Sequence, residues 1–136
     1  MPFELYWQPR GVVRRHVGHV SIAERRRSLE LVCTDPRFDE LRYCISDYLG
    51  ALSYEFTPES TAETAALHIA PARTNPNIVL ATVAVHPNAV ASAQHFIALR
   101  YVDLPCQLFP SLSAARAWIA GLQPTLVPRP RPLKDD

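Results

Sequence analysis

The side chains that could carry chemistry in this 136-residue chain are scattered, and none forms a motif that defines a reaction. Two of them, Asp47 and His86, each follow an apolar stretch. If these stretches are neighbouring strands, the carboxylate and the imidazole could exchange a proton, which requires an approach to about 3 Å. A lone histidine at a strand end is more often structural, so we expect no catalytic residue and keep an enzyme as an alternative.

Polar side chains also stand where helices are expected to begin. In an open parallel sheet, such positions surround the carboxyl ends of the strands, where ligands bind. The competing interpretation is that these side chains cap helices and close turns, as helix starts require in any protein. The candidate ligand-binding residues at this edge of the sheet are Asp47, Thr57, Ser60, His86, Asn88 and Ser111.

Metal, cofactor and nucleic-acid sites are not expected. His16 and His19 are three residues apart without an HExxH pattern, and the other histidines fall on different predicted elements. The three cysteines lack CxxC spacing, so we expect them to be small apolar core residues. A net charge of +1 provides no general attraction for nucleic acid or an anionic membrane.

Five arginines lie close together in the sequence, at positions 14, 15, 25, 26 and 27. Those on the predicted helix are interspersed with Glu24 and Glu30, which is typical of a solvated helix face. The charges of Arg14, Arg15 and His16 place their strand near an edge of the sheet, because a strand buried on both faces would not tolerate them.

The hydrophobic pattern predicts one α/β domain over residues 1–122. Residues 3–7 and 12–17 form an antiparallel hairpin, and further strands are expected at 41–46, 78–85 and 105–109. Helices are expected at 22–33, 57–70, 89–100 and 111–122, and residues 48–56 form an irregular connection. The order β-β-α-β-α-β-α-β-α predicts a mixed five-stranded sheet whose later strands run parallel, with about four helices.

Residues 78–85 form the central strand, because this run is almost entirely apolar and β-branched. The face of the 57–70 helix carries Ala62, Ala65 and Ala66, so this helix can lie close to the sheet. We therefore expect little space for a cavity between the helices and the sheet. Trp7 and Trp118 are expected to anchor the core.

Residues 123–136 are predicted to be an extended, flexible tail, because four prolines and two arginines fall between positions 124 and 132. No apolar run reaches the ~18–20 residues that a membrane span needs. The first ten residues lack the apolar core of a secretory signal, so we expect a cytoplasmic protein.

Several short segments, taken in order, resemble the SpoIIAA-like (STAS-like) family of small bacterial α/β proteins. They lie within about residues 3–122: 15–21 (RHVGHVS), 35–39 (DPRFD), the strand 41–46 with Asp47, 75–77 (NPN), Phe109 and 114–118 (AARAW). The resemblance implies a regulatory, non-enzymatic module that acts through a protein partner or through self-association as a homodimer.

The resemblance also implies a phosphorylated hydroxyl at the start of the helix that follows the third strand. Thr57 and Ser60 are the candidates, although the Asp-Ser-rich pattern of the family is absent from residues 56–61. Two alternatives remain open. One is a small ligand-binding protein or enzyme that uses the crevice at the strand ends, and the other is a carrier of an apolar ligand or lipid.

Overall fold

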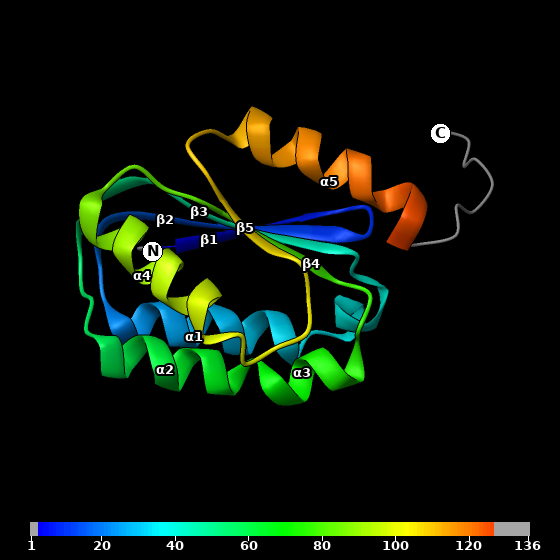
Figure 1. Cartoon of the computed structure of the whole chain (residues 1–136), viewed down its shortest axis with the longest axis horizontal. Helices are drawn as coiled ribbons and strands as arrows, with labels where there is room; N and C mark the ends of the chain where they lie inside the picture. The colour runs from blue at the N-terminus through cyan, green and yellow to red at the C-terminus, as the bar shows by residue number, and fades with distance from the viewer. Residues whose placement is uncertain (1–2, 127–136) are drawn as a thin grey trace.

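Five strands and five α-helices make up residues 3–126, the part of the chain that this computed structural model describes (Figure 1). The strands are β1 (Phe3–Gln8), β2 (Gly11–Val20), β3 (Tyr43–Tyr54), β4 (Val79–Val83) and β5 (Cys106–Phe109). The helices are α1 (Ile22–Cys33), α2 (Pro58–Leu67), α3 (Ile69–Thr74), α4 (Pro87–Leu99) and α5 (Leu112–Leu126), with a 3₁₀ turn at Pro36–Glu40.

The strands form one mixed sheet in the order β1-β2-β3-β4-β5. β1 runs antiparallel to β2, and all the other neighbours are parallel. β4 lies between β3 and β5, and its Val79 and Val83 have no exposed surface. The predicted mixed α/β sheet with an apolar central strand is therefore confirmed.

β3 is longer than predicted. It does not end at Ser46 but continues to Tyr54, through the segment expected to be irregular. Its register against β2 shifts twice, between Arg15 and Val17 and again between Gly18 and His19. Each shift leaves an extra residue on β3, as a β-bulge does, so the strand bends but keeps its partner. Asp47 consequently lies inside a strand and not at its end.

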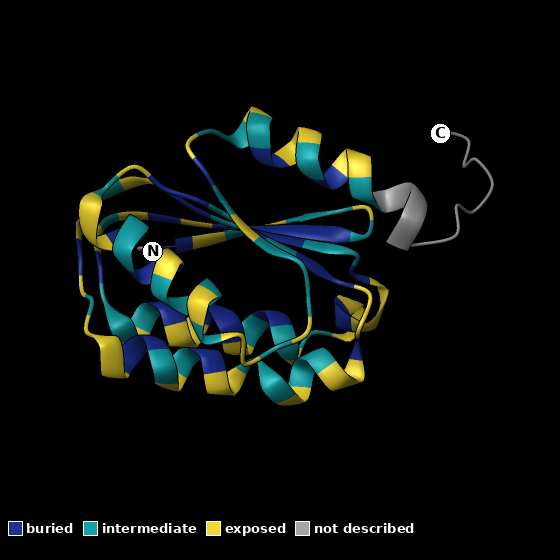
Figure 2. Cartoon of the chain, in the orientation of Figure 1, coloured by how far each residue is buried: buried dark blue, intermediate teal, exposed yellow. Residues whose placement is uncertain are grey.

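The helices cover the two faces of the sheet unequally. α1, α2, α3 and α4 lie on one side, and α5 alone lies on the other (Figure 1). The buried residues face the sheet from both sides, as the dark segments in Figure 2 show. Under α5 the core contains Ile45, Val79, Ala115 and Ile119. On the α1–α4 side, separate clusters form around Val32 with Leu41 and around the tyrosines of β3.

Helix ends follow the predicted signals in most places. Ser21 Oγ accepts a hydrogen bond from the Glu24 N–H at 3.1 Å, and the Glu24 carboxylate accepts one from the Ser21 N–H, which confirms the capping box. The single helix expected at 57–70 is interrupted at His68 and continues as α3 to Thr74. α5 extends past the predicted end at Leu122 to Leu126, and the remainder of the predicted tail, 127–136, lies outside the described residues.

Candidate functional site

Asp47 is buried in β3, with 2% of its surface exposed. Its Oδ2 accepts a hydrogen bond from Arg15 Nε at 3.3 Å, and its Oδ1 accepts one from the Leu49 N–H at 2.9 Å. The second bond supports the backbone where β3 begins to bend away from its first register. The Asp47 carboxylate therefore stabilises the backbone of β3. It lies inside this strand and not at the strand end, where the sequence predicted it.

Thr57 and Ser60 form a reciprocal cap at the start of α2. Thr57 Oγ1 accepts from the Ser60 N–H at 3.0 Å, and Ser60 Oγ accepts from the Thr57 N–H at 3.2 Å. Ser60 Oγ also donates to the Thr57 carbonyl at 2.9 Å, and Ser60 is only 5% exposed. Thr57 itself is exposed. Both hydroxyls thus do the work of a helix cap, and only Thr57 is open to solvent.

The remaining predicted residues also have local structural partners. His86, not Asn88, is the N-cap of α4, and its Nδ1 accepts from the Asn88 N–H at 3.1 Å. The Asn88 amide donates to the Tyr54 carbonyl at 3.2 Å and ties α4 to the end of β3. Ser111 Oγ accepts from the Ala114 N–H at 3.2 Å, which caps α5. Asp47 bonds to Arg15 and to the Leu49 N–H, whereas His86 bonds to the Asn88 N–H. No hydrogen bond in the described chain joins Asp47 to His86, so nothing there supports the predicted acid–base pair.

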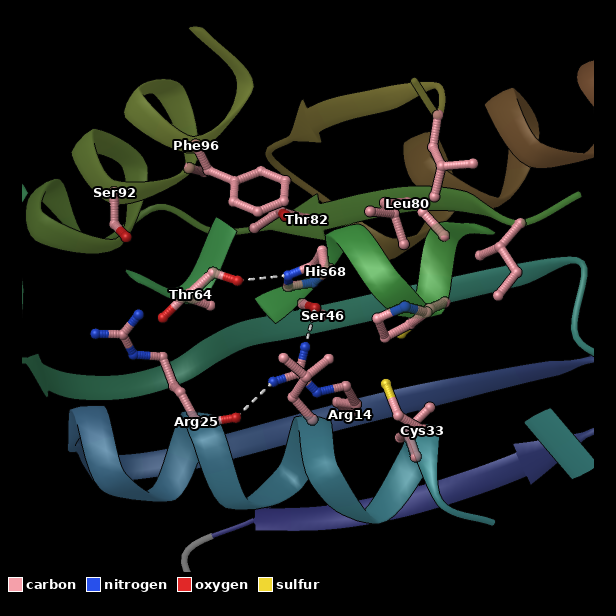
Figure 3. A pocket seen from close by; sticks show the side chains of 18 of the residues that line it. Arg14, Arg25, Cys33, Ser46, Thr64, His68, Leu80, Thr82, Ser92 and Phe96 are labelled. Atoms are coloured by element: carbon pink, nitrogen blue, oxygen red, sulfur yellow. Dashed lines mark hydrogen bonds between the residues drawn. The ribbon is translucent and has the colours of Figure 1, made fainter. Parts of the chain in front are cut away.

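The structure instead contains a cavity of about 100 Å³ on the α1–α4 side of the sheet. α1, α2, α3 and α4 form its walls, and β2, β3 and β4 form its floor (Figure 3). The sequence predicted little space here, and this expectation was wrong. The alanines of α2 do not bring that helix onto the sheet, because its main contacts are with α3 and α4. Arg14 of β2 and Arg25 of α1 both line the space beneath it.

Arg14 is the most unusual group in the cavity wall. It is 5% exposed, and its Nη2 donates to Ser28 Oγ at 2.7 Å and to the Arg25 carbonyl at 3.0 Å. Its Nη1 donates to Ser46 Oγ at 3.1 Å, a contact drawn in Figure 3. Hydroxyls and a carbonyl are neutral acceptors, and no carboxylate in the described part of the chain forms an ion pair with Arg14. The guanidinium charge therefore faces the cavity without a counter-ion.

Arg25 enters the same cavity from α1 and is 4% exposed. Its guanidinium lies 4.3 Å from the centre of the Tyr54 ring, and its Nη2 donates to the Glu55 carbonyl at 2.5 Å. Its Nε has no hydrogen-bond partner among the described residues. The prediction of a solvated arginine face on this helix was thus wrong for Arg25, although Arg26 and Arg27 are exposed.

The other titratable groups around the cavity are neutral. His68 Nδ1 donates to the Thr64 carbonyl at 2.8 Å, and desolvation lowers the pKa of His68 to about 4. Burial, with a smaller effect from Cys44, raises the pKa of Cys33 to about 11. Burial also raises the pKa of the Cys44 thiol, as expected for a core cysteine. The cavity is therefore positively charged near Arg14 and Arg25 and uncharged elsewhere.

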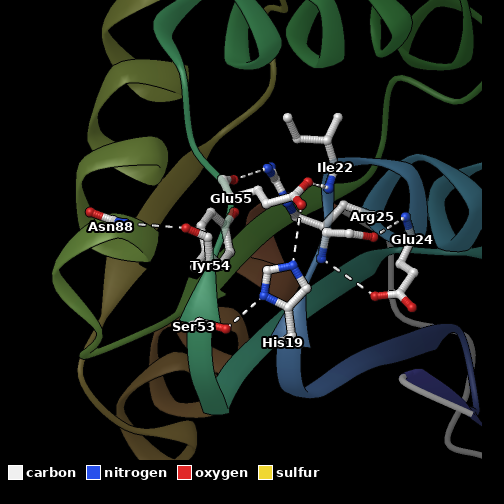
Figure 4. A network of polar contacts seen from close by, with 9 residues as sticks. His19, Ile22, Glu24, Arg25, Ser53, Tyr54, Glu55 and Asn88 are labelled. Carbon is white, nitrogen blue, oxygen red and sulfur yellow. Dashed lines mark hydrogen bonds and ion pairs between the residues drawn. The ribbon is translucent and has the colours of Figure 1, made fainter.

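A second polar cluster joins His19, Ser53 and Glu55 near the ends of β2 and β3 (Figure 4). His19 Nδ1 lies 2.6 Å from Ser53 Oγ, and His19 Nε2 lies 3.1 Å from Glu55 Oε2. This group could not be predicted from the sequence, because two register shifts between β2 and β3 bring it together. A hydroxyl, an imidazole and a carboxylate in contact can share a proton, but the His19 side chain is 59% exposed, so the cluster lies open to solvent. Glu55 Oε1 also accepts from the Ile22 N–H at 2.8 Å, so the cluster fastens the start of α1 to the sheet.

Residues 3–126 contain neither a candidate metal site nor a candidate membrane span. No group of three or more histidine, cysteine or acidic side chains is arranged so that it could hold a metal ion there. None of the helices in that range has both the length and the apolar character that crossing a bilayer requires.

The fold is similar to that of a solved structure, the anti-sigma factor antagonist SpoIIAA in its unphosphorylated form. The TM-score is 0.60 at 12% sequence identity, and the match covers 88% of this chain and 98% of the SpoIIAA chain. No family model matches the sequence, and no curated protein matches it either. The chain thus has the STAS-like fold that its short segments suggested, and at this identity the likeness concerns the fold alone.

Proposed function

We propose that this protein is a cytoplasmic, non-enzymatic regulatory module that acts by binding another protein. The fold supports this proposal at a general level, because the similar structure is that of a protein named as an antagonist of an anti-sigma factor. The observation that carries it for this chain is an apolar patch on the side of the sheet where α5 is the only helix (Figure 1).

The open-face patch consists of Tyr6, Val17, Leu49 and Val85, which are between 40% and 60% exposed. Arg15 pairs in register with Asp47, and Asp47 with Val83. Side chains two residues apart on a strand share a face, so Val17 projects on the same side as Arg15. Leu49 and Val85 follow Asp47 and Val83 at the same spacing, at the first bulge of β3 and just beyond the end of β4. Contiguous exposed apolar side chains on an otherwise polar surface are typical of protein interaction sites.

The partner expected at this patch presents apolar side chains with a complementary rim. Arg15 and Asp47 border the patch as an ion pair at 3.3 Å, and Arg15 also lies over the Tyr6 ring at 5.5 Å. Glu4 adds an acidic side chain beside the patch, because it pairs in register with Arg15 and accepts a hydrogen bond from the Tyr6 hydroxyl. Such a surface does not favour nucleic acid, which binds to basic patches. A second copy of the chain is the alternative occupant.

Thr57 is the residue that we propose for regulation by phosphorylation, with Ser60 as the less accessible candidate. The Thr57 hydroxyl is exposed, whereas the Ser60 hydroxyl is buried and donates to the Thr57 carbonyl. A phosphate at the N-cap would lie at the positive end of the α2 dipole, where negative charge is stabilised.

Site-specific photo-crosslinking in the native host tests the proposal. A photoreactive amino acid at position 49 is expected to capture one discrete protein, and the same amino acid at position 67 is expected not to. Leu67 is a matched control because it is 45% exposed, but on α2, on the opposite side of the sheet. The Leu49→Asp variant should lose the partner, because it places a charge in an apolar contact.

Two results would contradict the proposal. The first is the same set of adducts at positions 49 and 67. These positions lie on opposite sides of the sheet, and a specific interface would involve only one of them. The second is the absence of any adduct at position 49. An adduct with the mass of two copies of this chain identifies self-association, and sedimentation of the purified protein then checks it.

A further inference from the structure

We propose that the cavity between α1–α4 and the sheet binds a small organic acid, with its carboxylate at Arg14 and a short apolar chain in the remaining space. This inference concerns the interior of the molecule and is independent of the protein-binding patch on the opposite side of the sheet. It is carried by three observations: an unbalanced charge, the division of the walls into polar and apolar parts, and the size of the space.

The charge is the first observation. An arginine keeps its positive charge in a folded protein, and a buried charge is strongly destabilising unless it is paired. Arg14 has 5% of its surface exposed, and its hydrogen-bond partners are Ser28, Ser46, the Arg25 carbonyl and the Cys44 thiol. Each of these groups is neutral, so none balances the guanidinium charge. A ligand carboxylate would supply the missing negative charge.

Arg25 adds to the same anion site. Its Nε is buried without a partner, and Tyr54, which stacks on it, also lines the cavity. Glu55 is the carboxylate whose charge reaches Arg25, but it is exposed and engaged with His19 and with the start of α1. Two arginines therefore point their charge into the cavity, and neither is neutralised there by a buried acid of the described chain.

The walls change character along the cavity, which is the second observation. Around the arginines they are formed by hydroxyl-bearing residues such as Ser46, Thr64 and Ser92, which are labelled in Figure 3. Away from the arginines, the cavity is lined by apolar side chains: Val32, Phe38, Leu41, Ile78, Leu80 and Leu104. Inorganic phosphate would leave the apolar walls uncovered, and a hydrocarbon would leave Arg14 unpaired. A carboxylate with an apolar chain satisfies both parts.

The size of the space selects a short chain. Cavities that hold drug-sized ligands measure roughly 300–1,000 Å³, whereas this cavity is about 100 Å³. A whole membrane lipid is therefore too large for the cavity. Of the apolar ligands that the sequence left open, the cavity can hold an acid of a few carbon atoms. A surface groove between α1 and α2 shares Leu29, Cys33 and Pro71 with the cavity, so the two spaces adjoin at these side chains.

Calorimetric titration of the full-length protein with a series of straight-chain acids tests the inference. Acetate, butanoate, hexanoate and octanoate are the probes, and hexanamide is the neutral control of nearly the same shape. We expect affinity to pass through a maximum at an intermediate chain length. We expect hexanamide to bind at least about tenfold more weakly than hexanoate, because it cannot neutralise Arg14.

Two variants distinguish a specific site from general adsorption. Arg14→Met removes the charge and should weaken binding of the best acid at least about tenfold. Arg26→Met is its matched control, since Arg26 is an exposed arginine of α1 that pairs with Glu63, and it should bind as the wild type does. If Arg14→Met does not fold, Ala72→Phe decides, because Ala72 lines the cavity from α3 and a phenyl ring there should abolish binding of the longer acids.

The inference is overturned by any of three results: no acid in the series binds at millimolar concentration, hexanamide binds as well as hexanoate, or Ala72→Phe binds every acid as the wild type does. Equal binding by a folded Arg14→Met variant also overturns it. None of these results bears on the crosslinking experiment at position 49, so the two proposals fail separately.

Discussion

His16 shows how strongly one side chain can depend on its surroundings. Its ring has no exposed surface and lies between the rings of Phe3 and Tyr48, at 5.4 and 5.2 Å. Its Nε2 contacts Ser28 Oγ at 3.1 Å. Burial, and then the charges of Arg14 and Arg25, lower the pKa of His16 from 6.5 to about 3. The imidazole is therefore neutral in the folded protein at every pH at which the protein is expected to work.

The depressed pKa predicts acid sensitivity. Below pH 6.5 the unfolded chain binds a proton at His16 that the folded chain does not, so stability falls as the pH drops from 6.5 towards about 3. One such group contributes up to about 1.4 kcal/mol per pH unit in that window. The His16→Phe variant should show a smaller decrease in unfolding free energy between pH 6.5 and pH 4, measured by urea denaturation.

The matched control for this prediction is Phe3→Leu. It weakens the ring stack but keeps the titrating imidazole, so it should lower stability at every pH and leave the slope unchanged. An unchanged slope in His16→Phe would show that the acid sensitivity originates elsewhere, with His68 as the next group to vary.

The individual residues also show where prediction from sequence ends. Ser21 with Glu24, and Thr57 before Pro58, were identifiable because a cap and its helix are neighbours in the chain. The burial of Arg14 was not identifiable, because its acceptors on Ser28, Arg25 and Ser46 come from α1 and β3 and meet it only in the folded molecule. An arginine in a strand usually indicates a position exposed to solvent, whereas Arg14 lines the buried cavity.

Among the elements, α2 depends on the reciprocal cap at its start. Thr57→Ala removes the acceptor of the Ser60 N–H and should destabilise the protein by about 1 kcal/mol. Thr57→Asp should recover most of this loss, since a carboxylate also caps and is favoured at a helix N-terminus. Chemical denaturation of the three proteins measures both effects.

Thr74→Ala is the control for the cap, because Thr74 is an exposed helical threonine whose Oγ1 donates to the Ala70 carbonyl within its own helix. It should change stability much less than Thr57→Ala. Equal losses in the two variants would mean that the Thr57 cap contributes nothing particular to α2.

β3 and β4 illustrate why some elements are easier to predict than others. β4 belongs to a run that is apolar except for Thr82 and lies between parallel neighbours, so its composition matches its central position. The second half of β3 contains Leu49, Gly50 and Leu52, all exposed, and it pairs with β2 through two register shifts. The pairing of this segment depends on β2 and not on its own hydrophobic pattern. The sequence of residues 48–54 alone therefore does not predict a strand.

At the scale of the whole molecule, α5 alone covers one face of the sheet, whereas four helices cover the other face. Its Ala115 and Ile119 are buried against Ile45, Val79 and neighbouring residues of the sheet. Ile119→Ala should lower the unfolding free energy by about 2–5 kcal/mol, because it leaves a cavity in that core. Arg116→Ala, on the exposed side of α5, should change it by less than about 0.5 kcal/mol.

Urea denaturation followed by two probes checks this prediction. Circular dichroism reports the helices. In a Trp7→Phe background, tryptophan fluorescence reports Trp118 alone, which packs against Phe109 with ring centres 5.4 Å apart. Both transitions should move together to lower urea in Ile119→Ala. A fluorescence transition that moves alone would show that α5 detaches before the rest of the domain unfolds.

The overall architecture was the most predictable level. The alternation of strands and helices fixed the fold class, because β-α-β units in one sheet run parallel with few permitted topologies. The candidate site was the least predictable. Most of the predicted residues cap helices, as Thr57, His86 and Ser111 do. The cavity is lined by residues of three strands and four helices that lie together only in the folded chain.

The position of α5 in the chain has a consequence for synthesis. This helix follows β5, so the sheet surface bearing Val13, Ile45 and Val79 has no cover until residues 112–126 have left the ribosome. A nascent chain that has already paired its strands would expose this surface to the cell, where such species tend to aggregate. Slow translation of the last helix would therefore make the growing chain a client of chaperones that shield apolar segments.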